Sequence, residues 1–237
     1  MKKTIFFLFS IFTFFNLSAQ TTDKSFISIS LGPSFPVGDF GNKSVSDDKA
    51  GLATIGGFIN LNYGYKISDN FGAIAIVRGS IYGIDKDALK SSIAVPYGSG
   101  GSLSVTATTW KTGSLLAGLF QGFELNSNKS LILEARGAIG VQRSQSPSLK
   151  FTGSIPGIGT YQGEQQSSSA TSFAYLLGLG LNYGLGNNLT LKLHGDYNSS
   201  TPKFEDVSIS SSSSNTSVNS KQSISTVDVG IGLSFSF

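Results

Sequence analysis

The chain has 237 residues, enough for one all-β domain, and only 13% of them are charged, against roughly 25% in an ordinary soluble domain. The formal net charge is +3, and it falls to +1 when the two lysines Lys2 and Lys3 are set aside. The sequence has no basic tract, which argues against a nucleic-acid partner, and it has no Cys, which excludes disulfides and thiol-based metal or redox sites.

The N-terminal segment has the pattern of a secretory signal peptide. Lys2 and Lys3 precede an apolar run over residues 5–17, and Ala19 supplies the small residue before a cleavage site. The run is shorter than the roughly 20 apolar residues of a membrane-spanning helix. We therefore expect a signal peptide over residues 1–19 and a single β-barrel domain over 20–237; the alternative is an uncleaved N-terminal anchor.

Apolar residues alternate with small or polar ones along most of the remaining chain, and a period of two predicts β-strands. The third and fourth segments are apolar on both faces over part of their length. The eight predicted strands are 27–32, 53–65, 71–82, 109–124, 131–142, 172–183, 189–198 and 227–237. Most contain about ten residues or more, which suffices to cross a bilayer at a tilt.

The connections alternate in length. Three are short turns at 68–70, 126–129 and 186–188, whereas the other four are long. The long connections cover residues 34–51, 84–108, 145–171 and 199–223. This asymmetry is typical of outer-membrane barrels, and with an even strand number it predicts that both termini face the periplasm.

Three parts of the long connections have sequence patterns that predict a structure. Residues 92–95 and 103–106 flank a glycine-rich turn and predict one hairpin. Residues 148–151, followed by the glycine-containing stretch 153–163, predict another. The Ser-rich stretch 208–225 fits either a mobile loop or a further strand extension.

Alternation alone does not say which face of a barrel is outside, because a soluble barrel turns the same pattern inside out. The low charge of the polar positions and the placement of aromatic residues next to the short turns both favour lipid outside. Chance and the β-propensity of aromatic residues are the alternative explanation for that placement. The predicted aromatic belt comprises Tyr63, Tyr65, Phe71, Phe123, Tyr183, Phe235 and Phe237. A second belt at the other end would contain Trp110, Phe173, Tyr175 and Tyr197.

Charged residues on the polar parity are then expected inside the barrel, where they should pair because an unpaired buried charge is costly. The predicted lumen network comprises Arg78, Glu124, Glu134, Arg136, Lys192, His194, Asp196 and Asp228. It is expected to act as a plug that fixes the strand register; the alternative is a gate that exchanges partners to open a pore. His194 beside Asp196 also allows a general base, but we expect no catalytic site. No metal or other cofactor is predicted, since the acidic loop pairs 47–48 and 85/87 have nonspecific spacing.

The C-terminal strand 227–237, which ends in Phe237, resembles the terminal signature that the barrel-assembly machinery reads in outer-membrane barrels. Residues 30–40 resemble the opening of the small porin-like outer-membrane barrels of Bacteroidota. The resemblance covers residues 20–237 and implies a closed antiparallel transmembrane up-and-down β-barrel of eight strands in the outer membrane of a Gram-negative bacterium. Related OmpA-type proteins often carry a periplasmic peptidoglycan-binding domain, and this chain is not expected to share that role.

An eight-stranded barrel is only wide enough to be filled by side chains. We therefore expect a non-enzymatic, monomeric surface protein that binds an unknown extracellular ligand through its long loops and contacts membrane lipid and lipopolysaccharide. The alternatives are a porin for small solutes or ions and a lipid-modifying barrel enzyme that depends on His194.

Overall fold

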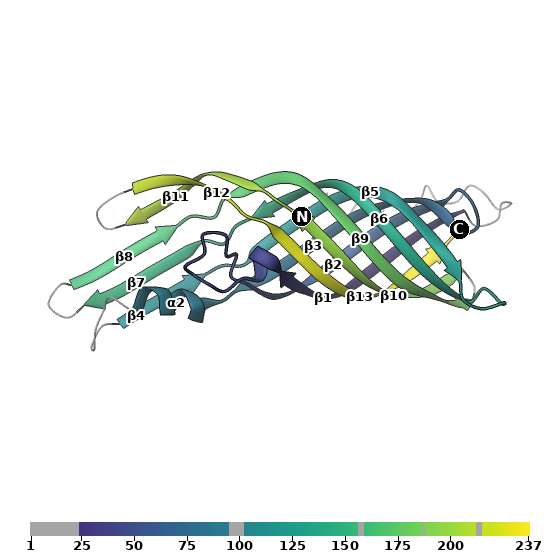
Figure 1. The fold of residues 1–237 in the computed structure, drawn as a ribbon, viewed down its shortest axis with the longest axis horizontal. Helices are drawn as coiled ribbons and strands as arrows, with labels where there is room; N and C mark the ends of the chain where they lie inside the picture. The colour runs from purple at the N-terminus through teal and green to yellow at the C-terminus, as the bar shows by residue number, and fades with distance from the viewer. Residues whose placement is uncertain (1–23, 95–101, 156–158, 187, 212–214) are drawn as a thin grey trace, which may run out of the picture.

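The computed structural model describes residues 24–94, 102–155, 159–186, 188–211 and 215–237, so the predicted signal peptide at 1–19 lies outside the described residues. Eight strands form a closed barrel in the order β1-β13-β10-β9-β6-β5-β3-β2, and every neighbouring pair is antiparallel (Figure 1). The barrel strands are β1 (Ser25–Val37), β2 (Ala53–Lys66), β3 (Phe71–Ile84), β5 (Trp110–Glu124), β6 (Leu131–Gln145), β9 (Ser169–Gly186), β10 (Leu189–Ser200) and β13 (Ile224–Ser236). The predicted eight-stranded all-β fold is confirmed.

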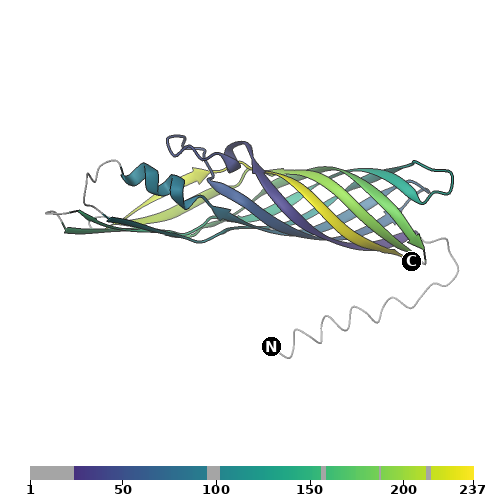
Figure 2. The same cartoon turned by 90° about the horizontal axis from the view of Figure 1, so that it is seen from below.

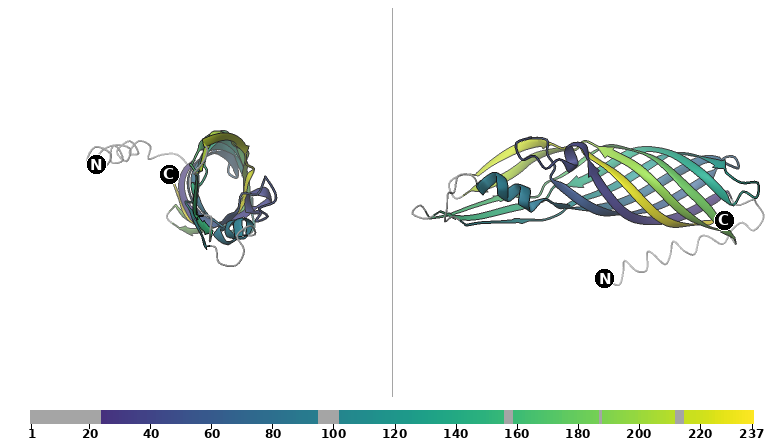
Figure 3. Two further views of the ribbon diagram at one scale, coloured as in Figure 1. Left: turned by 90° about the vertical axis from the view of Figure 1, so that its left-hand side faces the viewer. Right: turned by 60° about the horizontal axis from the view of Figure 1, so that its bottom comes forward.

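The barrel closes where the first strand meets the last. Ile27 lies opposite Phe235, and the backbones of Ser25 and Phe237 exchange hydrogen bonds of 3.1 and 2.8 Å. The end-on view in Figure 3 shows the resulting ring. Closure pairs the backbone groups of every strand within the barrel, which a sheet in hydrocarbon requires.

Short turns join the strands at one end of the barrel, and the chain from β1 and the C-terminus reach the same end (Figure 2). Lys129 and Asn188 have φ values of 56° and 65° in these turns, as the reversal of direction requires. In the turn between β5 and β6, Asn126 also accepts a hydrogen bond from the amide of Leu131 at 3.0 Å.

At the opposite end the long connections fold into a second sheet that extends beyond the barrel (Figure 1). We call it the outer sheet; its strand order is β12-β11-β8-β7-β4. Its strands are β4 (Ser102–Ala107), β7 (Leu149–Ile155), β8 (Gly159–Gln165), β11 (Lys203–Ser211) and β12 (Asn215–Lys221). The hairpin predicted from residue 148 onward is confirmed as β7–β8, and the Ser-rich stretch contributes strands rather than a loop.

The hairpin predicted between residues 92 and 106 is wrong. Residues Lys86–Ala94 form the helix α2, and β4 pairs instead with β7, where Val105 lies opposite Phe151. The carboxylate of Asp85 accepts a hydrogen bond from the amide of Ala88 at 3.0 Å, which caps the first turn of the helix. Leu89 then packs in a cluster with Leu52 and Val105, and this tertiary contact favours the helix.

The two faces of the barrel have opposite polarity, as predicted. Outward positions are apolar and well exposed, for example Leu115 at 60% and Leu179 at 62%. Inward positions hold most of the polar side chains, among them Asn60, Gln142 and Asp228 at 0%. The exterior is therefore built to face hydrocarbon. In the part of the chain that the structure describes, no helix has the length and apolarity needed to cross a membrane.

Candidate functional site

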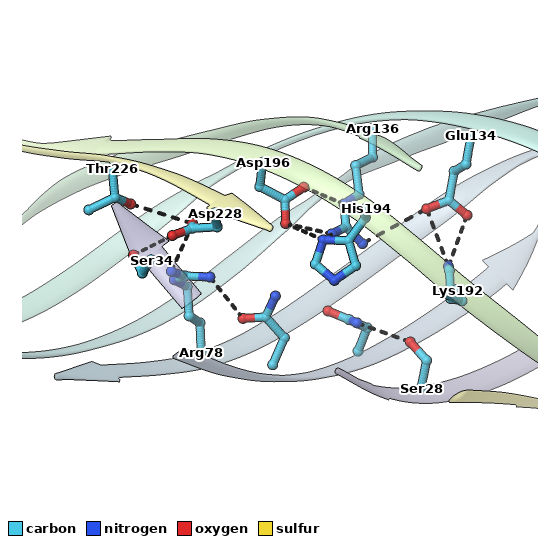
Figure 4. A network of polar contacts seen from close by, with 12 residues as sticks. Ser28, Ser34, Arg78, Glu134, Arg136, Lys192, His194, Asp196, Thr226 and Asp228 are labelled. Atoms are coloured by element: carbon cyan, nitrogen blue, oxygen red, sulfur yellow. Dashed lines mark hydrogen bonds and ion pairs between the residues drawn. The ribbon is translucent and has the colours of Figure 1, made fainter. Parts of the chain in front are cut away.

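The lumen contains a chain of ion pairs between β6 and β10, on which the inward alternation places five charged or titratable residues (Figure 4). Nearest the short-turn end, Lys192 Nζ lies 3.0 Å from Glu134 Oε2. Glu134 Oε1 is also 3.8 Å from Arg136 Nη1. Arg136 then holds Asp196 through two hydrogen bonds of 3.0 and 2.6 Å, which is the fork geometry of a strong guanidinium–carboxylate pair. His194 Nδ1 lies 2.9 Å from both groups of that pair.

A second group lies on the side of the long loops. Arg78 on β3 reaches across the lumen to Asp228 on β13, with 2.8 Å between Nη2 and Oδ2. Ser34 donates a hydrogen bond to the same carboxylate, and Asn60 accepts one from Arg78 at 3.2 Å. The Arg78 guanidinium also stands 4.4 Å from the centroid of the Phe58 ring, a cation–π contact. Asp228 lies opposite Asp196 in the strand pairing, so the two groups are neighbours.

The charges of these two groups balance. Three cations (Arg78, Arg136 and Lys192) face three carboxylates (Glu134, Asp196 and Asp228), and each residue is at most 6% exposed. Buried charges are tolerated when they are paired and hydrogen-bonded. The arrangement is therefore suited to holding strands in place, because the pairs Arg78–Asp228, Arg136–Asp196 and Lys192–Glu134 each join strands that are not neighbours in the barrel.

Inward glycines make room for these side chains. A Cβ at Gly178 would overlap the Asp196 carboxylate and come within 3.0 Å of Arg136 Nε. A Cβ at Gly230 would lie 2.5 Å from His194 Nε2 and 2.8 Å from the Phe58 ring. The glycines that alternate with leucine in β9 are thus explained by lumen packing.

Two apolar clusters share the barrel interior with the ion pairs. The inner cluster lies beside them, since Lys192 Nζ stands 5.1 Å from the centroid of the Phe26 ring. It comprises Phe26, Ile74, Ile76, Leu116, Phe120, Ala138, Ala174 and Leu176. The outer cluster comprises Phe40, Ala53, Tyr82, Trp110, Phe204, Val207 and Ile224. Phe40 comes from the short 3-10 helix η2 (Gly38–Gly41), and its ring centroid lies 5.5 Å from that of Trp110. Apolar and charged side chains therefore fill the lumen together.

Two predicted positions need correction. Trp110 is not part of an exterior belt: it is 6% exposed, and its Nε1 donates to the carbonyl of Gly51 at 3.1 Å inside the outer cluster. Glu124 is not in the lumen network either. It ends β5 at the level of the short turns, where it pairs with Lys129 at 3.0 Å and accepts a hydrogen bond from Asn70 at 3.2 Å.

The other seven predicted network residues all lie in the lumen. The structure adds uncharged members that were absent from the predicted network. Gln142 accepts hydrogen bonds from Ser114 and Asn198 and donates one to Ser200 at 2.6 Å. Gln142 lies on the same face of β6 as Glu134 and Arg136, and this shared parity in the sequence already indicated that it points into the lumen. Which residues meet across the lumen does not follow from parity.

The seven predicted belt residues lie at the short-turn end and point outward. Six of them are large exposed side chains, with exposed fractions between 39% for Phe237 and 51% for Phe123. Phe71 is partly exposed. Phe235 and Phe237 stack with 6.5 Å between ring centroids. At the other end, Phe173, Tyr175 and Tyr197 point outward.

The chemistry available to His194 is limited by its surroundings. The side chain is enclosed between the Arg136–Asp196 pair and the Phe58 ring, whose centroid lies 5.9 Å away. Among the described residues no three His, Asp or Glu side chains are grouped as a metal site would require. The acidic loop residues have local partners: Asp47 accepts from Asn42 at 2.7 Å, and Asp85 pairs with Lys43 at 2.9 Å. The capping amide of Ala88, together with Lys43, lowers the pKa of Asp85 below its usual value.

Comparison with known proteins gives similarities in structure. A scan against protein-family models finds no match, and neither does a search of the curated proteins. Among solved structures, Neisserial surface protein A matches at 13% identity and a TM-score of 0.44, covering 90% of this chain and 97% of that one. The attachment invasion locus protein of Yersinia pestis matches at 17% identity and 0.44, covering 91% and 100%. The outer membrane protease OmpT from Escherichia coli matches at 11% identity and 0.47, covering 94% and 99%. These are likenesses of architecture, and they assign no activity to this chain.

Proposed function

We propose that this protein is a closed, non-conducting outer-membrane barrel that binds an extended segment of a partner protein at the edge of its outer sheet. The observation that carries the proposal is the free edge of β12. This strand ends the outer sheet, pairs only with β11, and is exposed from Thr216 to Lys221. An exposed edge offers unpaired backbone donors and acceptors to which an extended peptide can add as a further strand.

The opposite edge of the outer sheet is less suited to this role. β4 lies beside α2, and Val105 is buried in the cluster with Leu52 and Leu89. Next to β12, by contrast, a cavity of about 230 Å³ opens between the outer sheet and the connection from β1 to β2. Val218, Leu149 and Gln165 are among its lining residues, and they offer both apolar contact and hydrogen bonds to a side chain of the added strand.

The filled lumen supports a binding role over transport. A bulk solute would have to displace side chains of the inner cluster, of the ion pairs and of the outer cluster. We likewise propose no enzymatic role for His194, because Arg136 and Asp196 hold its Nδ1 and the imidazole is buried beside the Phe58 ring.

Several further assignments belong to the same proposal. The termini face the periplasm, the exposed aromatic rings at the short-turn end lie at the membrane interface, and Phe237 is read by the barrel-assembly machinery. The chain acts as a monomer in contact with membrane lipid and lipopolysaccharide. Its origin in a Bacteroidota species is proposed on residues 30–40.

A peptide-display selection tests the edge. The full chain in nanodiscs is presented with a library of displayed ten-residue peptides, and enriched peptides are titrated against two variants. In the first, residues 208–219 are replaced by a short Gly-Ser turn, which removes the outer part of β11 and β12. In the second, Leu89→Ser disturbs α2 on the other side of the sheet. We expect binding to be lost in the first variant and kept in the second; enriched peptides that still bind the shortened variant would contradict the proposal.

A further inference from the structure

The outward face of the barrel is interrupted by a groove near the long-loop end. Its volume is about 810 Å³, and its lining includes Leu31, Pro33, Gly57, Ile59, Ile81 and Lys111. The groove crosses β1, β2, β3 and β5, so it cuts across the strands on the surface that faces hydrocarbon.

Glycines, which have no side chains, form the floor of this groove. Gly57 lies opposite Pro33 and Ile81, and Gly79 lies opposite Ile59 and Gly113 in the strand pairing. A Cβ added at Gly113 would meet nothing within 4 Å, and one at Gly79 only Ile59 Cγ2 at 3.8 Å. Lumen packing does not account for these outward glycines, which leave a hollow between the side chains of Leu31, Ile59 and Ile81.

Two cations stand at the end of the groove. Lys111 lines it, and Arg143 lies on the neighbouring strand directly opposite Gly113. Across all eight barrel strands, every residue of which is described, Lys111 and Arg143 are the only charged residues on the outward parity. Both are exposed and both are positive, so no acidic side chain on the barrel exterior offsets them.

The groove is apolar, and the pair of cations beside it has no acidic partner on the barrel exterior. Near the long-loop end, where we expect the headgroups of the bilayer to begin, this combination matches the chemistry of an anionic lipid. Lys and Arg near a membrane surface attract phosphate groups, and they extend from the apolar surface towards the headgroups. We propose that this groove binds one acyl chain of an anionic phospholipid of the leaflet at the long-loop end, with the phosphate on Lys111 and Arg143. The site is separate from the β12 edge.

Native mass spectrometry tests this on the full chain released from nanodiscs of phosphatidylcholine with a minor fraction of phosphatidylglycerol. Each cation near a membrane surface contributes roughly fivefold to the association of an anionic lipid, so the pair contributes roughly 30-fold. We expect one retained phosphatidylglycerol per chain, lost in the double variant Lys111→Ser/Arg143→Ser. Lys150→Ser, which removes an exposed cation of the outer sheet, is the control and should retain the lipid.

Filling the hollow tests the acyl chain separately. Gly79→Leu with Gly113→Leu should also abolish retention although both cations remain, whereas Gly195→Leu, at another outward glycine with open surroundings, should not. Heat-modified migration in gels checks that each variant has folded. Retention that survives the loss of both cations, or the filled groove, would overturn the proposal. So would a dimer of the wild-type chain that disappears when the groove is filled, because the occupant would then be a second copy.

Discussion

Replacing Arg136 by Met should destabilise the barrel more than any change at an exposed ion pair. Arg136 makes two hydrogen bonds to Asp196 and lies 3.8 Å from Glu134, and it is 6% exposed. Met keeps the apolar volume but leaves the Asp196 carboxylate buried with only His194 beside it. Removing one partner of a buried pair costs about 3–5 kcal/mol, which is a factor of roughly 10² to 10³ or more in the unfolding equilibrium.

The assay is equilibrium unfolding in urea from lipid vesicles. The single tryptophan, Trp110, is buried in the outer cluster and reports the transition by its fluorescence. Lys150→Met is the control: its pair with Glu164, at 3.2 Å, lies in the exposed outer sheet and should contribute less than about 1 kcal/mol. Asp196→Asn in the Arg136→Met background should recover part of the loss, because the uncompensated charge is gone. If the free energy of unfolding of Arg136→Met differs from the wild-type value by less than about 1 kcal/mol, which is the value of one exposed ion pair, the reasoning is refuted.

Three other predictions follow from the packing. Gly178→Ala should lower the free energy of unfolding by about 1–3 kcal/mol, because its Cβ would overpack against the Asp196–Arg136 pair. Gly137→Ala, on the outer face with its nearest neighbour at 3.5 Å, should change that free energy by no more than about 0.5 kcal/mol. The urea midpoints of the two variants test both values. Because the folded pKa of Asp85 lies below its usual value, its contribution is present above an unfolded pKa of about 3.9 and is lost as the pH falls through the folded value. The amide resonance of Ala88 should therefore move to its position in an unbonded amide as the pH falls through that lowered folded value, and Asp85→Ala should loosen α2 by about 1 kcal/mol. In planar bilayers the purified protein should give no stable unitary currents; reproducible conductance steps would contradict a filled lumen.

The alternation of residue types was sufficient to predict the barrel. The segment 53–65 became β2 with its end displaced by one residue, and the predicted polar parity faces the lumen because a two-residue period leaves only two choices of face. The connections were harder. For a nine-residue helix such as α2, the capping Asp85 is only a weak local signal, and the helix is held by contacts with Leu52 and Val105, which are distant in sequence.

The membership of the lumen network was predictable only in part, for a similar reason. Parity placed Arg78 and Asp228 inside, but their contact depends on the curvature of the closed sheet, which brings β3 opposite β13. Trp110 shows a related limit: it shares the inward parity of Thr112 and Ser114, but its contact with Phe40, which comes from another connection, could not be read from that parity.

The pair between Arg78 and Asp228 spans the seam at which the barrel closes, since β2 and β1 separate their two strands. In the open sheet Arg78 lies on the third strand from one edge and Asp228 on the strand at the other edge, so the two side chains cannot meet. A closure displaced by two residues along the seam would keep the alternation of faces but leave both charges buried without each other. The ion pair therefore favours the correct register of closure, because only that register removes the free-energy penalty of two unpaired buried charges.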